Sequence, residues 1–408
     1  MFVINIGQLV TPQGSKGVSG EEMKNLTILE DAYIQIVNGQ ILSMGMMSEL
    51  PKAMRDRTLD AKRGVVIPGL IDPHTHAAFY GSREEEFLAR CLGEPYGKGI
   101  LTSMNLVRAA TDEQIYQYSR RFLLDMISRG TTTVEIKSGY GLNTEGELKL
   151  LKVIKRLKAN LPIEVVPTFL GAHAIPEGVK KEDYVGEIVE KMIPQVVSHR
   201  LAEFCDIFCE RGFFSISDSR EVLKAASSVG LKLKLHAEEF QNSQSAELSA
   251  ELKATSADHL LFISSNGMYA MLEAGVIPVL LPGTAFTLNL NYAPAREMID
   301  MGLPVALGTD FNPGTCLVHS MLLILSLAVM KMKMSVEEAL TAATLNAAAA
   351  LDRAGITGSL EEGKRGDLVV LDLKNYRQIP YFFGHGVVHA VVASGKIIYE
   401  RESGLAAN

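Results

Sequence analysis

Short apolar runs alternate with amphipathic segments through the middle of the chain. Eight runs have the length and composition of buried strands: residues 65–71, 131–137, 163–170, 205–210, 231–236, 256–260, 277–281 and 304–308. Most are separated by segments with helical spacing of apolar residues: 112–129, 144–159, 183–202, 217–229, 243–253 and 335–350. Eight strand–helix units over about 300 residues favour an α/β fold, the (β/α)8 or TIM barrel, over an open doubly wound sheet, which stays the alternative.

The two ends of the chain show a different pattern, in which apolar and polar residues alternate along short runs. The alternation passes through residues 32–44 around the turn Asn38-Gly39, and it returns in residues 366–372 and 387–398. Neither end alone has enough strands for a stable sheet. We therefore predict a small β-sandwich domain built from residues 1–64 and 362–408, with the barrel, residues 65–361, inserted between them.

Composition excludes several classes of protein. The 408 residues are 47% hydrophobic and 21% charged, which is ordinary for a soluble enzyme and excludes a mainly disordered chain. A net charge of −7 without a Lys/Arg cluster predicts no nucleic-acid partner, and an anionic small-molecule substrate would need a local cation. No signal peptide or membrane span is recognisable, and the four cysteines lack disulfide or zinc-finger spacing, so we expect a cytoplasmic protein without membrane association.

Candidate chemistry begins with His74 and His76, which follow the first apolar run. In a strand, residues separated by one point to the same side, so two such imidazoles can bind one ion. Three later runs also end near a residue able to bind a metal: His236, His259 and Asp310. Barrel enzymes carry out their chemistry at the carboxyl ends of the strands, where these residues would meet.

Neutral histidines and a carboxylate are the usual ligands of a catalytic zinc or similar ion. We predict that the ligands are His74, His76, His236 and Asp310. Such an ion lowers the pKa of bound water from about 16 to about 7, which suits hydrolysis or deamination. The alternative is that His236 and Asp310 are ordinary polar groups at strand ends. Because the 205–210 run ends without a lysine that could bridge two ions, one ion is expected, and Lys137 is interpreted as a structural or electrostatic residue.

Glu239 is the candidate general acid/base, because it follows His236 by three residues and can handle the proton of the attacking water. Glu238 competes for this role, since adjacent residues at a strand end diverge and only one of them can face the site. His259 is either a further ligand or, as we prefer, an imidazole that orients the nucleophile or polarises the scissile carbonyl.

The residues around these positions resemble a known family. Residues 68–76, Pro-Gly-Leu-Ile-Asp-Pro-His-Thr-His, resemble the first-strand motif of the amidohydrolase superfamily, and residues 363–369 resemble its return into the small β-domain. Four further segments resemble the imidazolonepropionases, enzymes of histidine degradation: residues 81–87, 135–142, 169–173 and 308–315. The resemblance covers nearly the whole chain, although Glu238 stands where an aspartate is common.

This resemblance implies hydrolysis of 4-imidazolone-5-propanoate at its ring amide C–N bond to N-formimidoyl-L-glutamate, with one Zn²⁺ or Fe³⁺ per subunit and a homodimer. Its ligand positions match the four predicted above. Its substrate-contact positions fall on Arg83, Tyr140, His173, Glu239, Asn312, Gly314 and Thr315. In the expected mechanism, His259 and Asp310 position the nucleophile and Glu239 protonates the departing nitrogen.

Elementary chemistry supports Arg83 in particular, because a guanidinium can bind the propionate carboxylate through two parallel hydrogen bonds. Tyr140 and His173 can donate to the tail or the ring. The alternative for Arg83 is a surface ion pair within the acidic run 84–86. Residues 96–99, with two glycines, are a candidate for a loop that closes over the substrate.

Two other functions remain open. A cyclic deaminase or another cyclic-amide hydrolase of the same superfamily would use the same ligands on a purine, a pyrimidine or a different ring. A non-catalytic scaffold on an old hydrolase fold would be expected to have lost ligands, whereas every ligand position here is filled.

Overall fold

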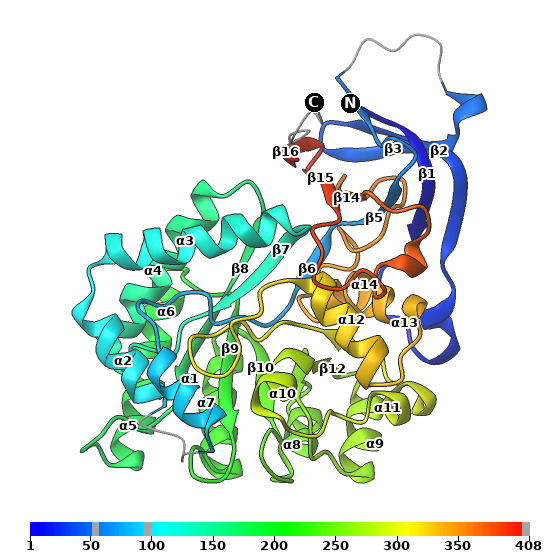
Figure 1. Ribbon diagram of the computed structural model, residues 1–408. Helices are drawn as coiled ribbons and strands as arrows, with labels where there is room; N and C mark the ends of the chain where they lie inside the picture. Colours follow the sequence, from blue (N-terminus) through cyan, green and yellow to red (C-terminus); the bar gives the residue numbers. More distant parts are fainter. Residues whose placement is uncertain (51–56, 94–98, 402–408) are drawn as a thin grey trace.

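The structure is a computed structural model that describes residues 1–50, 57–93 and 99–401. Three residues of the predicted closing loop, 96–98, lie outside this part of the chain. Eight parallel strands follow one another in chain order around a barrel (Figure 1). They are β6 (Leu70–Asp72), β7 (Thr131–Lys137), β8 (Glu164–Ala172), β9 (Phe204–Cys209), β10 (Lys232–Ala237), β11 (Ser256–His259), β12 (Ile277–Leu280) and β13 (Ala306–Leu307). Each predicted run overlaps one of them, which confirms the α/β barrel.

The barrel closes just beyond the ends of its first and last strands. Thr75 forms a parallel bridge with Phe311, and the amide of Asp310 donates to the carbonyl of His74 over 3.0 Å. The amide of His76 donates to the carbonyl of Phe311 over 2.8 Å. These bonds join two of the three segments that carry the predicted metal ligands.

Helices surround the strands on the outside of the barrel (Figure 1). Capping boxes begin three of them, with Thr111, Ser215 and Ser335 accepting from an amide three residues later. The predicted helix at 183–202 is interrupted by the π-helical turn Ile188–Met192 between two shorter helices. The helices are α1 (Glu84–Cys91), α2 (Ile100–Ala109), α3 (Asp112–Ser128), α4 (Thr144–Asn160), α5 (Lys181–Glu187), α6 (Ile193–Ser198), α7 (Ile216–Ser228), α8 (Ser245–Glu251), α9 (Ser265–Ala274), α10 (Pro282–Leu288), α11 (Ala295–Met301), α12 (Met321–Lys331), α13 (Val336–Ala342) and α14 (Leu345–Ala349).

A second, mixed sheet combines both ends of the chain, seen in Figure 1 as the blue and red strands beside the barrel. Its strands are β1 (Phe2–Thr11), β2 (Thr27–Val37), β3 (Gln40–Met46), β4 (Thr58–Asp60), β5 (Val65–Pro68), β14 (Leu368–Leu371), β15 (Val388–Ala393) and β16 (Lys396–Glu400). One face of it encloses a single apolar cluster that includes Val3, Ile6, Ile34, Val66, Leu368, Val370 and Ala390. The sheet therefore folds over its own core, as a small sandwich does.

The run 65–71, predicted as one barrel strand, is divided between the two sheets. Its first part, β5, pairs with β1 and β14, and only its second part, β6, pairs with β7 in the barrel. Gly69 lies between them, and a Cβ at this position would collide with the side chain of Thr132. Periodicity alone could not show this change of sheet, because both halves are fully buried. We propose that residues 1–64 with 362–408 and residues 65–361 form two domains, between which 65–68 cross.

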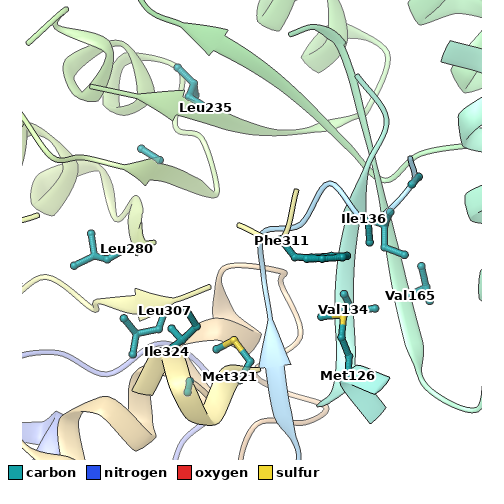
Figure 2. Close-up of a cluster of buried hydrophobic side chains, with 14 of the residues drawn as sticks. Met126, Val134, Ile136, Val165, Leu235, Leu280, Leu307, Phe311, Met321 and Ile324 are labelled. Carbon is teal, nitrogen blue, oxygen red and sulfur yellow. The ribbon is translucent and has the colours of Figure 1, made fainter. Parts of the chain in front are cut away.

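The main apolar core fills the space between the barrel strands and their helices. Figure 2 shows Phe311 near the middle of this cluster, with Val134 and Ile136 of β7 on one side and Leu307 of β13 on the other. Because these side chains are buried, the strand ends above them are held in place. Within the described residues, no helix has both the length and the apolar character needed to cross a membrane.

Candidate active site

The predicted ligands meet at the carboxyl ends of the barrel strands. Oδ1 of Asp310 lies 3.6 Å from Nε2 of His74 and 3.6 Å from Nε2 of His76. Nε2 of His236 lies 3.2 Å from Nε2 of His76. All four side chains are buried, although β10 and β13 are far in sequence from the His74-Thr75-His76 segment.

The donor set fits a metal ion. Nδ1 of His74 contacts Oδ2 of Asp258 at 2.6 Å, and Nδ1 of His236 lies 3.0 Å from Oδ2 of Asp206. These carboxylates favour a proton on Nδ1, so the lone pairs of both Nε2 atoms point inward, where uncompensated they would repel each other. The ligand-to-ligand separations resemble the edge of about 3.4 Å expected for tetrahedral bonds of about 2.1 Å.

The electrostatics favour neutral imidazoles at this site. Burial and the neighbouring cationic groups lower the pKa of His74 and of His76 well below the usual histidine value. A histidine must be neutral to bind a metal. Burial also raises the pKa of Asp310 to about 6, and its Oδ2 accepts a hydrogen bond from the hydroxyl of Thr284.

Beneath the predicted ligands lies a buried charge network, of which the sequence analysis singled out Lys137 as a structural or electrostatic residue but not its partners. Nζ of Lys137 lies 2.8 Å from a carboxylate oxygen of Glu135 and 2.8 Å from one of Asp206, and Nζ of Lys234 lies 3.5 Å from Asp258. Burial alone would lower the pKa of Lys137, but the surrounding carboxylates outweigh it and raise the pKa. The signal was present in the sequence, because charged residues inside apolar strand runs are unusual unless paired.

Backbone geometry separates the two candidate acid/base residues. Glu238 has a left-handed φ of 53°, which turns the chain at the end of β10. Glu239 consequently lines the cavity, with its Oε2 3.7 Å from Nε2 of His259. Burial, with a smaller contribution from Asp310, raises the pKa of Glu239 well above the usual carboxyl value. Such a group can carry a proton at neutral pH.

Glu238 points away from the cavity, toward the start of α8. Its Oε1 accepts a hydrogen bond from the amide of Ala246 at 3.5 Å. Burial, together with the nearby Glu247, raises the pKa of Glu238 to about 8. This carboxyl group is therefore separated from the ligands by the turn of its own backbone.

His259 stands at the end of β11 with a left-handed φ of 80°. Its ring centroid lies 5.2 Å from that of His236 and 5.4 Å from that of His74. Neither ring nitrogen has a hydrogen-bond partner within the described residues, and the nitrogens of His74, His236 and His259 lie within 4.8 Å of one another. Both predicted roles, ligand and orienting imidazole, are compatible with this position.

A cavity of about 630 Å³ opens in front of these residues. It is lined by most of the predicted substrate-contact residues: Arg83, Tyr140, His173, Glu239, Asn312 and Thr315. Phe208, Phe213 and Phe240 make part of its wall apolar. The ring of His173 stacks on that of His76 at 4.9 Å, and burial lowers the pKa of His173 to about 3.

Arg83 is buried at the cavity, with 7% of its surface exposed, so it is not a surface residue. Its Nη2 is nevertheless 2.6 Å from Oε2 of Glu86, so the expected partner in the acidic run is present. Gly314 lies directly against this guanidinium, and a Cβ there would collide with it. Asn312 holds the Gly314 loop, because its Oδ1 accepts from the amides of Gly314 and Thr315 at 2.8 and 2.7 Å.

Known proteins with similar sequences belong to the family that the sequence motifs resemble. Residues 65–398 match the family model described as the Amidohydrolase family. An imidazolonepropionase from Caldanaerobacter subterraneus subsp. tengcongensis is 45% identical over 400 residues, which cover 96% of each chain. One from Geobacillus thermodenitrificans is 46% identical over 413 residues, covering 98% of this chain and 97% of the relative.

Solved structures agree on the fold. Guanine deaminase from C. acetobutylicum, with bound guanine, superposes with a TM-score of 0.73 at 18% identity and covers 98% of this chain and 99% of its own. The 5-methylcytosine deaminase from Klebsiella pneumoniae, liganded with 5-fluorocytosine, gives a TM-score of 0.75 at 18% identity and 98% coverage of both chains. At this identity the likeness concerns the fold alone.

Proposed function

Because the chain belongs to the amidohydrolase family and, within it, to the imidazolonepropionases, we propose that it hydrolyses 4-imidazolone-5-propanoate to N-formimidoyl-L-glutamate. The reaction breaks the ring amide C–N bond. The observation that carries the proposal is the convergence, in one cavity, of candidate metal ligands, the buried carboxyl group of Glu239 and the guanidinium of Arg83. A cyclic amide with an anionic tail needs all three.

His74, His76, His236 and Asp310 are proposed to hold one Zn²⁺ or Fe³⁺ per subunit. Both ions accept imidazole and carboxylate ligands. When bound, such an ion lowers the pKa of a water ligand and polarises a carbonyl oxygen. Asp206 and Asp258 keep the histidine rings in the orientation that this requires.

The protein side chains then handle water and protons. His259 and Asp310 orient the attacking water, whose oxygen forms the new bond to the ring carbonyl carbon. The C–N bond breaks, and Glu239 passes the proton removed from the water to the departing ring nitrogen. The 3.7 Å between Glu239 and His259 places both groups at the same side of the cavity.

The tail of the substrate is proposed to lie at the Arg83 end of the cavity. Arg83 binds the carboxylate, and Tyr140 and His173 contact the tail or the ring. Asn312, Gly314 and Thr315 form the loop beside the guanidinium, where the absence of a side chain at Gly314 leaves room for it.

The decisive experiment follows imidazolone absorbance after mixing the purified protein with freshly generated 4-imidazolone-5-propanoate. We expect rapid loss that disappears after chelation and returns when Zn²⁺ or iron is restored. No loss from a folded, metal-loaded protein would overturn the proposal and direct the search to purines and pyrimidines, the substrates of a cyclic deaminase.

We also propose a cytoplasmic location and a homodimer. The described cysteines are all free thiols, three of them buried, which suits a reducing compartment. The homodimer rests on the imidazolonepropionase resemblance, and light scattering of the purified protein tests it.

A further inference from the structure

A second arginine, Arg90, reaches the cavity that holds Arg83. It lies in the last turn of α1, whose N-cap residue is Arg83. Its Nη1 donates to the carbonyl of Gly314 over 3.2 Å. Its Nη2 is buried and has no hydrogen-bond partner within the described residues. Leaving a buried guanidinium nitrogen unpaired costs free energy, so an incoming acceptor at the cavity would relieve that cost.

The charge balance at this end of the cavity points the same way. Nε and Nη2 of Arg83 contact Oε2 of Glu86 at 3.2 and 2.6 Å, so this ion pair already offsets the charge of Arg83. Arg90 forms no ion pair within residues 1–50, 57–93 and 99–401, and its guanidinium lies 5.6 Å from the ring of Phe87. Among the described arginines that line the cavity, Arg90 is thus the one without an acidic partner.

The two guanidinium groups converge on one residue. Arg83 lies against Cα of Gly314, and Arg90 is hydrogen-bonded to the carbonyl of Gly314. They reach this point from positions seven residues apart along the same helical segment, so both point to one side of it. A carboxylate placed beside Gly314 would meet donors from both arginines.

We propose that Arg90 is a second substrate-binding residue, which supplies the net positive charge that selects a ligand with a carboxylate tail. Arg83, whose charge is offset by Glu86, then mainly donates hydrogen bonds to the carboxylate of the ligand. Arg90 supplies the positive charge that attracts this carboxylate. The inference rests on the proposed function in one respect, namely that the carboxylate bound by Arg90 is the propionate tail of the substrate. The recognised chemistry is a propionate carried by a small planar ring.

Direct binding tests this without turnover. The probe is 3-(imidazol-4-yl)propanoate, which keeps a ring and the tail but has no amide to hydrolyse, and its neutral control is the corresponding propanamide. In calorimetry, Arg90→Met should weaken binding of the acid by about 10- to 100-fold, as expected for a charged hydrogen bond, and change binding of the amide by less than about threefold. Arg90→Lys should recover part of the loss.

The matched control is Arg156→Met, which removes an arginine paired with Glu113 at the exposed surface and should change neither affinity. Equal weakening of acid and amide by Arg90→Met would overturn the proposal, because it would mean that Arg90 only fastens the Gly314 loop. Unchanged affinity for both would overturn it as well.

Turnover separates this inference from the proposed function. If wild-type protein hydrolyses the imidazolone, Arg90→Met should raise KM about 10- to 100-fold with kcat within about threefold. If wild-type protein does not hydrolyse it but binds the acid in an Arg90-dependent manner, the reaction assignment fails and the carboxylate site stands.

Discussion

Glu238 and Glu239 show how far two neighbouring residues can differ. Both are buried carboxyl groups with raised pKa values, yet one accepts a hydrogen bond from α8 and the other lines the cavity. The cause is a single left-handed backbone conformation at Glu238, of the kind that persists where the surrounding structure enforces it. The two residues are chemically identical, so their different roles follow from the direction in which each side chain points.

This contrast predicts different effects for two identical substitutions. Glu239→Gln should lower kcat by about 10²- to 10⁴-fold, the usual contribution of a general acid/base, while bound metal is unchanged by elemental analysis. Glu238→Gln should stay within a few-fold of wild type, because at neutral pH its carboxyl group, with a pKa of about 8, is mostly uncharged like the amide. Near-normal turnover by Glu239→Gln with metal bound would remove Glu239 from the mechanism.

Arg83 gives a second residue-scale prediction. Arg83→Ala should raise KM more than it lowers kcat, since the tail is held in both the ground and the transition state. The substitution also removes the cation that pairs with Glu86, which would keep only its hydrogen bond from Thr102, and the negative charge of Glu86 would then repel the substrate carboxylate. The double variant Arg83→Ala/Glu86→Gln should therefore regain part of the lost affinity in steady-state kinetics. An unchanged KM in the single variant would contradict the role.

At the scale of elements, the strands β9 and β11 position the proposed ligands of β10 and of the segment after β6. Asp206 of β9 contacts His236, and Asp258 of β11 contacts His74. Lys137 of β7 joins them, with Nζ 2.8 Å from Asp206 and 3.9 Å from Asp258. The geometry of the proposed metal ligands is thus held by side chains from neighbouring strands, and parallel pairing keeps these strands in register.

Asp258→Asn should accordingly lower metal affinity by about 10- to 100-fold, the usual effect of losing a carboxylate behind a histidine ligand. Competition with a metal chelator measures this directly. Thermal unfolding of metal-free protein shows separately whether the fold is weakened. Asp183→Asn, at an exposed position of α5, is the control and should leave metal affinity unchanged. Equal affinity in Asp258→Asn and wild type would show that Asp258 does not support the ligand.

At the scale of the whole molecule, the returning C-terminal segment is tied to the barrel by ion pairs. Glu164, at the start of β8, contacts Nε of Arg353 at 2.7 Å and also pairs with Arg365. Nη2 of Arg365 donates to Thr133 of β7 over 3.0 Å. Burial would raise the pKa of Glu164, but the two arginines outweigh it and lower the pKa from the usual glutamate value.

The lowered pKa determines the sign of a pH effect. A carboxyl group whose pKa falls on folding stabilises the fold above its unfolded pKa of about 4.3, and this contribution is lost as the pH falls through the folded pKa. Glu164→Gln should therefore reduce the free energy of unfolding by about 1–3 kcal/mol at pH 7, and by progressively less below pH of about 4. Urea unfolding of metal-free protein measures it. Glu113→Gln, at an exposed ion pair, is the control and should change little. A difference that does not narrow in acid would contradict this account.

The sequence by itself determined the repeating units and the ligand candidates. The eight strand positions follow from local periodicity, and His74, His76, His236 and Asp310 became candidate ligands because they are metal-binding residue types at or just after the ends of these runs. The family resemblance added the chemistry of the substrate. These predictions succeed because the information they need lies within short segments of the sequence.

Tertiary structure decided whatever depends on contacts between distant segments. The division of residues 65–71 between two sheets depends on β1 and β14, and the partner of His74 lies 184 positions away at Asp258. The turn that sends Glu239 into the cavity and the unpaired nitrogen of Arg90 are likewise set by their surroundings. For His74 the physical reason is that the direction of a buried polar side chain depends on the partner that offsets the cost of its desolvation. The other three features depend on backbone pairing and packing between segments that are distant in the sequence.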